Sequence, residues 1–418
     1  MSDLLTLEDL DLGALGGKRV FVRVDFNVPL AQPSGKAEDA GTGGEAAAGT
    51  GRRVLDDSRL IEALPTLREL AAAGGCLLLA SHCGRPKGER DARFSLRPVA
   101  ERLAELLGQE IGFAEDCVGE KAAAAAAALG RGEVLLLENL RFHAGETRND
   151  PAFAAQLAAL AEVYVDDAFG SAHRAHASVV GITRQLTRRA AGRLMAREVA
   201  SLARLLGDAE RPFVALLGGA KIEGKIDTLA NLLPRLDVLL LGGGMANTFL
   251  RARGYQLGAS LFEEDRVPLA REILERAAAR GVEVLLPLDL VVTDDLDQPR
   301  RIETVPADRV PPGTRAVDIG PATRQAFARA MAGARTLLWN GPLGVFEKPP
   351  FDAGTREMAQ ALAGCAGYSV IGGGETVAAA RQAGVAGRIG HVSTGGGAAL
   401  ELLAGKELPG VAVLERGQ

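Results

Sequence analysis

The sequence is poor in aromatic residues and in cysteine. Aromatic residues make up 4% of its 418 residues, which argues against a stacking platform for single-stranded nucleic acid. None of the four cysteines belongs to a Cys-x-x-Cys pair, so we expect reduced thiols in a cytosolic protein. The formal net charge of −5 excludes a globally basic nucleic-acid-binding protein, although it is compatible with a local basic cleft. The cysteines are Cys76, Cys83, Cys117 and Cys365.

Long hydrophobic runs are also missing. No stretch reaches the roughly 18 uncharged apolar residues of a transmembrane helix, so we expect no membrane span. Residues 1–16 mix acidic residues with leucine and contain no basic segment before an apolar core. This composition predicts no secretory signal and a cytoplasmic location. Hydrophobic residues nevertheless make up 47% of the chain, which at this length predicts about two or three globular domains.

Short apolar runs alternate with longer helical patterns along most of the chain. Near-continuous apolar runs are typical of strands buried on both faces of a parallel sheet, and repeated β-then-α order predicts an α/β fold of doubly wound, Rossmann-like sheets. Strands are expected at Val20–Val24, Cys76–Ala80, Val134–Leu137, Val163–Val165, Phe213–Leu217, Val238–Leu241, Val282–Leu286, Thr336–Trp339 and Tyr368–Ile371. Helices are expected at Leu60–Ala73, Arg97–Leu107, Pro151–Ala161 and Arg266–Arg280.

Two segments interrupt the alternation. Ala31–Arg53 is rich in glycine, alanine, serine and threonine without periodicity, which predicts a solvated, mobile loop, most simply a surface insertion without function. Leu186–Leu206 has no strand signal and carries leucines at helical spacing, which predicts a helical linker over residues 186–206. We therefore expect an N-terminal lobe at 1–185 and a C-terminal lobe at 207–404, two parallel-sheet lobes joined by a helical hinge.

Arginine, usually with histidine nearby, follows several expected strands of the N-terminal half. Ligands of open α/β sheets bind beyond the carboxyl ends of the strands, and guanidinium groups match phosphate and carboxylate. The pattern therefore predicts a small, multiply anionic substrate, although any one arginine is more simply a solvated surface charge. A metal site is disfavoured, because the neighbouring arginines would repel a dication and the cysteine and histidine spacings fit no zinc pattern. The residues concerned are His82, Arg85, Arg141, His143, His173, Arg174 and His176. Arg59 follows the Ala31–Arg53 segment instead and is expected to open a helix.

In the run VRVDFNVPL, polar residues follow the end of an expected strand. By alternation along an extended segment, Asp25 and Asn27 project to the same side. Together they offer hydrogen-bond acceptors and a donor, which suits a substrate hydroxyl group. A turn that uses both side chains only for local hydrogen bonds is an equally good interpretation.

The C-terminal half carries a glycine-rich turn with two lysines. Residues 219–225 read GxxxxGK after an apolar run, but Ile226 replaces the serine or threonine that a P-loop needs for Mg²⁺. A glycine-rich turn between strand and helix still offers backbone N–H groups to phosphate. Lys221 and Lys225 are four residues apart, which predicts that they share one face of a helix start.

Three more glycine-rich turns follow expected strands, at Gly242–Gly244, Asn340–Glu347 and Gly372–Thr376. The last turn leads into a helical pattern, so it predicts an anion site at a helix N-terminus with Glu375 as a carboxylate for a metal. None of these turns contains the GxGxxG motif, which argues against a dinucleotide-binding site. Together the four turns indicate a mononucleotide site.

These segments resemble phosphoglycerate kinases over nearly the whole chain. The matching stretches are VRVDFNVPL, SHCGRPKG, ENLRFH, DAFGSAHRAH, LLGGAKIEGKID, LWNGPLGVFE, GGGETVAAA and HVSTGGGAALELLAGKELPGV. The resemblance implies a glycolytic transferase, a hinge-bending monomer in two lobes. Its N-terminal lobe would bind 3-phosphoglycerate or 1,3-bisphosphoglycerate, and its C-terminal lobe would bind ADP or ATP with Mg²⁺. Residues 405–418 would return to pack on the N-terminal lobe.

The resemblance also implies roles for individual residues. In the N-terminal lobe, Asp25 and Asn27 would contact the glycerate, and Arg59 would lie next to the transferred phosphoryl group. The distal phosphate would be held by His82, Arg85, Arg141 and Arg174. In the C-terminal lobe, Lys221 would accompany the phosphoryl group during transfer.

The implied nucleotide site is formed by the glycine-rich turns. The adenine and ribose pocket would be lined by Gly242, Gly243, Pro342 and Val345, with Glu347 on the ribose. The phosphates would be bound by Gly219, Lys225, Gly373, Gly374 and Thr376, and Glu375 would bind the phosphates through Mg²⁺ as the metal ligand. Two residues depart from the family pattern, since Glu375 stands where the family usually has aspartate and Asp166 where it usually has asparagine.

An acyl-phosphate kinase is thus the leading hypothesis. A P-loop-like ATPase or switch is disfavoured by Ile226. A nucleotide-binding interaction protein that has lost catalysis is favoured only by the departure at Glu375.

Overall fold

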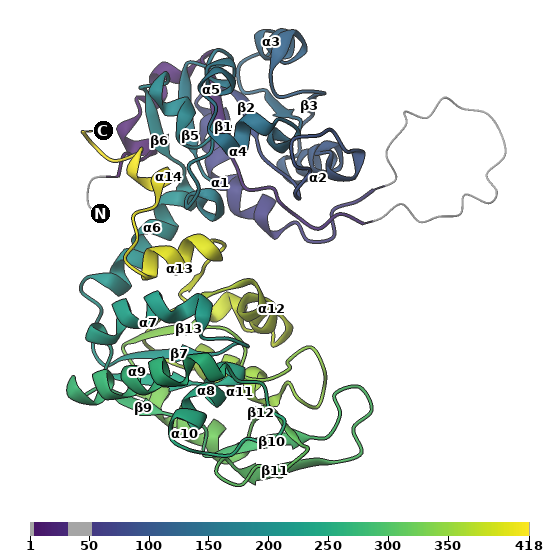
Figure 1. The fold of residues 1–418 in the computed structure, drawn as a ribbon. Helices are drawn as coiled ribbons and strands as arrows, with labels where there is room; N and C mark the ends of the chain where they lie inside the picture. Colours follow the sequence, from purple (N-terminus) through teal and green to yellow (C-terminus); the bar gives the residue numbers. More distant parts are fainter. Residues whose placement is uncertain (1–3, 32–51, 418) are drawn as a thin grey trace, which may run out of the picture. The chain divides into compact units, whose positions relative to one another are not determined.

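The structure is a computed structural model that describes residues 4–31 and 52–417. The chain divides into two compact units, one formed by Met1–Val199 with Glu407–Gln418 and the other by Ala200–Lys406 (Figure 1). Most of the expected loop at Ala31–Arg53, residues 32–51, lies outside the described residues. No helix in the described ranges is both long and apolar enough to cross a membrane.

The first unit is built on a six-stranded sheet with the order β3-β4-β2-β1-β5-β6. Every neighbouring pair in it is parallel, so the carboxyl ends of the strands meet at one edge. Its strands are β1 (Arg19–Arg23), β2 (Cys76–Ala80), β3 (Ile111–Ala114), β4 (Val134–Leu137), β5 (Val163–Asp166) and β6 (Arg189–Ala191).

Helices cover this sheet because the side chains of its central strands alternate between two apolar faces. Val22 and Leu79 pack in one core with Leu67 of the first helix, whereas Phe21 stacks on Tyr164 with ring centroids 6.2 Å apart. The helices of the first unit are α1 (Ser58–Ala72), α2 (Arg97–Leu107), α3 (Gly119–Ala127), α4 (Ala144–Arg148), α5 (Pro151–Ala158) and α14 (Pro409–Ala412).

The segment after residue 406 completes the first unit. The Leu5 N–H donates to the Leu414 carbonyl at 2.8 Å, and the Gly410 N–H donates to the Ala172 carbonyl at 2.8 Å. Leu408 and Leu414 are buried, Glu415 forms an isolated antiparallel bridge with Leu4, and Figure 1 shows α14 in yellow within the first unit. The first unit is therefore assembled from two stretches that are far apart in the sequence.

The second unit contains two sheets. Its parallel sheet has six strands in the order β15-β14-β13-β7-β8-β9, namely β7 (Phe213–Leu217), β8 (Val238–Leu241), β9 (Glu283–Leu285), β13 (Thr336–Asn340), β14 (Tyr368–Gly372) and β15 (His391–Val392). An antiparallel sheet of three strands, in the order β11-β10-β12, accompanies it. These strands are β10 (Asp289–Thr293), β11 (Ile302–Pro306) and β12 (Arg315–Ile319), and the sequence analysis did not predict this sheet.

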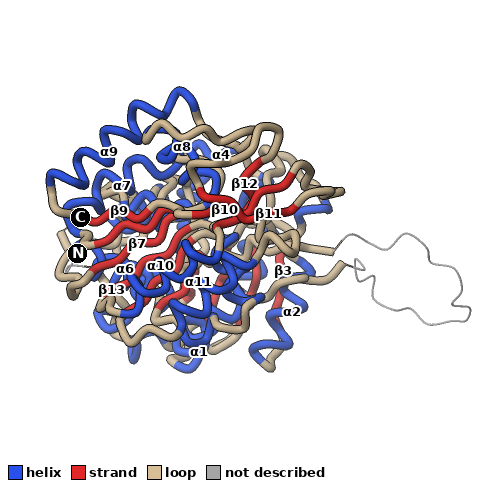
Figure 2. The backbone as a smooth tube through the Cα atoms, turned by 90° about the horizontal axis from the view of Figure 1, so that it is seen from below, coloured by secondary structure: helices blue, strands red, loops and turns tan. Residues whose placement is uncertain are grey.

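Helices lie on both faces of the parallel sheet of the second unit. Leu216 and Trp339 pack with Phe327, Met358 and Ala379 from three helices on one face. In Figure 2, α7, α8 and α9 lie above β7 and β9, and α10 and α11 lie below them. The helices are α7 (Ile226–Leu232), α8 (Gly243–Ala252), α9 (Val267–Ala279), α10 (Pro321–Ala332), α11 (Ala353–Ala363), α12 (Gly374–Gln382) and α13 (Gly397–Leu403). The predicted fold class, two doubly wound parallel-sheet α/β domains, is confirmed.

Helix α6 (Arg193–Leu206) begins in the first unit and ends in the second. Its first turn is capped by Asp167, whose Oδ1 accepts the N–H groups of Leu194 at 2.8 Å and Met195 at 3.1 Å. The expectation that 186–206 contains no strand was wrong, because β6 lies within it. Its sequence Arg-Ala-Ala gives no apolar run, and the strand exists through its pairing with β5.

Candidate active site

The carboxyl end of β1 carries Arg23, a guanidinium group with no exposed surface. Its Nε donates to the Ser178 hydroxyl at 3.0 Å, and its Nη2 donates to the Ser171 hydroxyl at 3.3 Å and lies 3.2 Å from Nδ1 of His82. Burial and the charge of Arg23 hold the pKa of His82 well below its usual value. His82 is therefore neutral, and because Nδ1 accepts from Arg23, its Nε2 carries the hydrogen.

Arg141 is a second buried guanidinium at this edge of the sheet. Its Nη1 donates to the Gly84 carbonyl at 2.8 Å, whereas its Nε has no hydrogen-bond partner among the described residues. Burial, together with the charges of Arg174 and Arg23, lowers the pKa of Arg141 to about 10. Arg23, Arg141 and Arg174 form no ion pair with a carboxylate of the described residues. The Arg174 Nε donates instead to the His173 ring at 3.0 Å. The three positive charges exceed the negative charge of the one neighbouring buried carboxylate whose pKa is lowered, that of Glu146, and this excess favours a multivalent anion.

Asp25, Asn27 and Arg59 lie close together in the first unit. Arg59 is the second residue of α1 and pairs with the Asp25 carboxylate. The Asn27 side-chain oxygen accepts the Gly84 N–H at 2.9 Å, and the Asn27 N–H donates to Asp25 at 3.3 Å. Asp25 thus makes a local hydrogen bond and pairs with Arg59 at the start of its helix, whereas the Asn27 side chain bonds to a segment distant in the sequence. Arg85 is exposed.

Two buried acids flank the arginines, and the sequence analysis missed one of them. Burial would raise the pKa of Glu146, but His176, Arg23 and the Ser178 hydroxyl outweigh it and lower the pKa. Burial raises the pKa of Asp166 to about 7. Its Oδ1 accepts the Ala168 N–H at 2.9 Å, and the Tyr164 hydroxyl lies 3.2 Å from its Oδ2.

The sequence analysis also missed Arg23 as a site residue. The one indication in the sequence was a charged residue inside the apolar run VFVRV.

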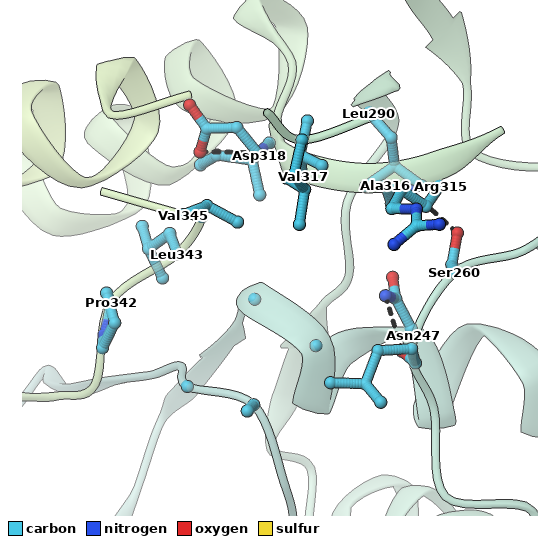
Figure 3. Close-up of a pocket in the computed structure, with 18 of the residues that line it drawn as sticks. Asn247, Ser260, Leu290, Arg315, Ala316, Val317, Asp318, Pro342, Leu343 and Val345 are labelled. Atoms are coloured by element: carbon cyan, nitrogen blue, oxygen red, sulfur yellow. Dashed lines mark hydrogen bonds between the residues drawn. The ribbon is translucent and has the colours of Figure 1, made fainter. Parts of the chain in front are cut away.

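The second unit contains a cavity of about 620 Å³ near the carboxyl ends of β7, β8 and β13 (Figure 3). Six of the residues implied for nucleotide binding line it: Gly219, Gly243, Pro342, Val345, Glu347 and Glu375. Its lining is mostly glycine, alanine, leucine and valine with few polar groups, which is typical of small-molecule sites.

The glycine-rich turns at this cavity pack backbone against backbone. The Gly219 N–H donates to the Pro342 carbonyl at 2.7 Å, and the Gly243 N–H donates to the Leu343 carbonyl at 3.1 Å. A Cβ atom on Gly243, whose φ is +66°, would lie 2.8 Å from the Gly219 carbonyl oxygen. Only glycine fits at this position, so backbone atoms rather than side chains line this part of the cavity.

The two lysines of the first turn do not share a helix face, so that prediction was wrong. Helix α7 begins at Ile226, after both residues. Lys221 is exposed, whereas Lys225 is half-buried and donates to the Gly218 and Asn340 carbonyls, the latter at 3.0 Å. Burial lowers the pKa of Lys225 to about 8, against the opposing charge of Glu375.

Helix α12 begins at the last glycine-rich turn, as predicted. Gly373 precedes the helix with a φ of +90°, and Glu375 is exposed in the first turn. The buried Thr376 hydroxyl accepts the Gly341 N–H at 2.6 Å, which ties this turn to the one after β13. Gly242 precedes α8 with an extended backbone, and Gly243, the first residue of α8, has a positive φ of +66°.

The chain is similar to phosphoglycerate kinases over nearly its whole length. A family model described as phosphoglycerate kinase matches residues 7–406. The chain is 52% identical to the phosphoglycerate kinase of Moorella thermoacetica over 410 residues, and each chain is covered to 98%. It is 52% identical to that of Thermomicrobium roseum over 409 residues, with 98% of each covered.

The chain belongs to the phosphoglycerate kinase family. The solved structure of the Coxiella burnetii phosphoglycerate kinase agrees, with a TM-score of 0.85, 37% identity and 98% coverage of both chains. That of Pyrococcus horikoshii has a TM-score of 0.82 at 32% identity, again with 98% coverage of both. The predicted activity, a kinase that transfers a phosphoryl group to a carboxyl acceptor, is confirmed.

In this phosphoglycerate kinase fold, the cavity also has polar residues that the sequence analysis missed. The Asn247 Nδ2 donates to the Leu261 carbonyl at 2.9 Å, while its Oδ1 has no partner among the described residues. The Ser260 hydroxyl accepts the Ala316 N–H at 2.8 Å. Asp318 is buried, which raises its pKa to about 7. Most residues on this side of the cavity come from β12 and the segments next to it. Because the sequence analysis did not predict the antiparallel sheet, it could not predict these residues.

Proposed function

We propose that this enzyme transfers a phosphoryl group reversibly between 1,3-bisphosphoglycerate and ADP, giving 3-phosphoglycerate and ATP in glycolysis. The first unit holds the phosphoglycerate and the second holds the nucleotide. The observation that supports this division best is the pair of buried guanidinium groups of Arg23 and Arg141, which lack a carboxylate partner among the described residues. A phosphorylated carboxylic acid supplies the missing negative charge.

In the first unit, the distal phosphate binds where positive charge accumulates. The Arg141 Nε and the His82 Nε2 are the donors left over by the internal hydrogen bonds, and Arg174 and the exposed Arg85 complete the set. Asp25 and Asn27 contact the glycerate. Because Arg59 is held by Asp25, its guanidinium lies beside the phosphoryl group that is transferred.

In the second unit, the cavity takes the adenine and the ribose. Its volume of about 620 Å³ lies within the range of roughly 300–1,000 Å³ for small-molecule sites. Adenine and ribose lie against Gly242, Gly243, Pro342 and Val345, with Glu347 on the ribose. The phosphates meet Gly219, Lys225, Gly373, Gly374 and Thr376, where two helices begin.

Glu375 fits the role of a magnesium ligand. Mg²⁺ in nucleotide sites is usually held by one or two carboxylates together with the substrate phosphates. Glu375 lines the cavity with an exposed carboxylate in the first turn of α12, next to the backbone groups that would hold the phosphates. When bound, Mg²⁺ neutralises charge on the phosphates, which eases the approach of an anionic nucleophile.

The protein contributes position and charge to the transfer rather than a covalent intermediate. Arg59 and Lys221 supply positive charge where negative charge spreads over the phosphoryl oxygens. Each substrate is held by a different unit, so the transfer requires a closing motion about a hinge. Closure also excludes water, which would hydrolyse the acyl phosphate. The enzyme acts as a cytoplasmic monomer.

A coupled assay of ATP formation from ADP and 1,3-bisphosphoglycerate, with and without Mg²⁺, tests the activity. Calorimetry on Arg174→Ala tests the division between the units. Loss of one charge-assisted phosphate contact should weaken 3-phosphoglycerate binding by about 1.5–3 kcal/mol, while ADP affinity stays unchanged. Arg148→Ala, which removes an exposed arginine nearby, is the control and should change neither affinity. Equal losses for both ligands would contradict the division.

A further inference from the structure

A cysteine, a histidine and an aspartate meet at the carboxyl end of β3 and β4. These strands are parallel neighbours, with Ala114 opposite Leu137, so the segments that follow them leave the sheet at the same edge. Asp116 and Cys117 follow β3 after one intervening residue, and His143 follows a short 3-10 helix after β4. The Asp116 Oδ1 lies 2.7 Å from the His143 Nε2, and the donor atoms of all three side chains lie within 4.8 Å of one another.

Neighbouring contacts hold the three side chains in place. The Asp116 Oδ1 also accepts the Cys117 N–H at 2.7 Å, and the His143 ring stacks on Phe153 with centroids 5.2 Å apart. Cys117 is only 1% exposed, whereas the side chains of Asp116 and His143 are 39% and 33% exposed. The thiol therefore forms the inner end of the cluster, and the other two groups leave an entry path from solvent.

The charges around the cluster favour a cation. The charged groups that act most strongly on Cys117 are the carboxylates of Asp116, Glu146 and Glu138, and Cys117 itself is buried. A substrate cannot reach so buried a thiol, so the arrangement does not form a cysteine–histidine–aspartate hydrolytic triad. A bound dication supplies the positive charge that a thiolate would need there.

We propose that Asp116, Cys117 and His143 form a binding site for a thiophilic divalent cation such as Zn²⁺. Sulfur, imidazole nitrogen and carboxylate oxygen are the donor set that zinc prefers, and three protein ligands leave a fourth position for water. Mg²⁺ is a poor match because it prefers oxygen ligands. The ion takes the place of the hydrogen between Asp116 and His143, the neutral imidazole then carries its hydrogen on Nδ1, and the thiol of Cys117 releases its proton to solvent on binding.

The sequence alone argued against this site, since it fits no zinc spacing. Two ligands are adjacent and the third lies on the segment after a different strand, so only the register of β3 against β4 brings them together. None of the three is a residue that the proposed function uses, so the site can be tested separately from phosphoryl transfer.

Cobalt titration of the full-length protein tests the proposal, because a cobalt–thiolate bond gives a charge-transfer absorption band. The protein should bind one equivalent of Co²⁺ with this band, and Zn²⁺ but not Mg²⁺ should displace it. Cys117→Ser should abolish the band, and His143→Gln and Asp116→Asn should each weaken Co²⁺ binding at least tenfold. Cys365→Ser, which alters a half-buried thiol elsewhere, is the matched control and should leave the titration unchanged.

If Cys117→Ser fails to fold, melting temperatures with and without Zn²⁺ test the proposal instead. Zn²⁺ should raise the melting temperature of the unmodified protein and of Cys365→Ser, but not of His143→Gln, whose side chain is partly exposed and whose fold should persist. Absence of the thiolate band from the unmodified protein would overturn the proposal. So would a band that persists in Cys117→Ser, or equal Co²⁺ affinity in His143→Gln.

Discussion

Asp166 is a buried carboxyl group opposite Arg23 in the register of β5 against β1. Burial raises its pKa from 3.8 to about 7, which means that the native protein binds this proton more tightly than the unfolded chain does. The contribution of the group to stability is therefore fully present below pH 3.8 and is lost as the pH rises through about 7. At alkaline pH the fold carries the cost of a buried, ionised carboxylate.

Asp166→Asn should remove this cost. The amide oxygen can still accept the Ala168 N–H, and the amide N–H can donate to the Tyr164 hydroxyl, whose own hydrogen points to the Ser178 carbonyl at 2.9 Å. We expect the variant to be more stable than the unmodified protein at pH 8, by on the order of 2 kcal/mol, with a smaller difference at pH 5. Denaturant-induced unfolding of both proteins at pH 8 and at pH 5 measures this difference in the free energy of unfolding.

Asp308→Asn, at an exposed position, controls for the loss of a charge and should show no such pH dependence. If Asp166→Asn were the less stable protein at pH 8, Asp166 would be ionised and paired with Arg23.

Glu375 can be tested through the magnesium dependence of the reaction. Glu375→Gln should raise the Mg²⁺ concentration for half-maximal rate and lower kcat, because the neutral amide is a weaker ligand, while 3-phosphoglycerate affinity stays the same. Glu375→Asp restores a carboxylate and should keep most of the activity. The alternative role is stabilisation of the first turn of α12, worth about 0.3–1 kcal/mol. An unchanged Mg²⁺ titration with a lowered melting temperature would favour that role.

Sequence patterns found the site residues that belong to a motif or a strand end more readily than those whose importance depends on their burial. Glycine turns and arginines at strand ends are visible as residue types, and six of the implied nucleotide residues do line the cavity. The buried state of Arg23 and the unpaired Oδ1 of Asn247 depend on what packs around them. No local pattern contains that information, because burial is produced by segments distant in the sequence.

At the scale of elements, strands were predictable where both faces are buried. Phe213–Leu217 and Cys76–Ala80 are continuous apolar runs, and they form β7 and β2 with the expected bounds. β11 alternates between exposed and half-buried residues at the edge of the small sheet, and β6 is only three residues long. Such strands arise from pairing with a neighbour, so their sequences carry little signal.

The segment 32–51 provides a prediction at this scale. Its two flanks are paired, since the Ala31 N–H donates to the Arg53 carbonyl and the Leu55 N–H donates to the Pro29 carbonyl, each at 2.9 Å. A short glycine-containing turn can therefore join them. Because each halving of loop length changes closure entropy by only about 0.6 kcal/mol, replacing 32–51 should leave the melting temperature and the activity nearly unchanged.

Thermal melting and the coupled assay check this outcome, and a variant with the segment replaced by a glycine–serine stretch of equal length is the control. Loss of stability in the short variant alone would show that the length of the segment matters. Loss of activity in both variants, with the fold intact, would show that its sequence does.

At the scale of the whole molecule, the two units depend differently on the residues after 406. A variant that ends at residue 406 loses the buried side chains of Leu408, Val411 and Leu414 from the first unit. Each buried aliphatic side chain contributes about 1.5–3 kcal/mol, so we expect the first unit to lose several kcal/mol. ADP binding to the second unit should persist. Hydrogen exchange resolved by segment and calorimetry with ADP measure the two effects.

Leu414→Ala, which removes one of these side chains, should cost about 2–5 kcal/mol in the same unit and serves as the graded control. Equal loss of exchange protection in both units would contradict the assignment of this segment to the first unit alone.

The discontinuity of the first unit also fixes an order of events during synthesis. Residues 200–406 form a unit from one continuous stretch, so they can fold as soon as they leave the ribosome. The first unit emerges earlier, but the hydrogen bonds of Leu5 and Ala172 to the returning segment cannot form until Gly410 and Leu414 have been translated. Until the residues after 406 have left the ribosome, the nascent chain would thus carry a complete second unit and an unfinished first unit, which makes its earlier half the better target for chaperones and proteases.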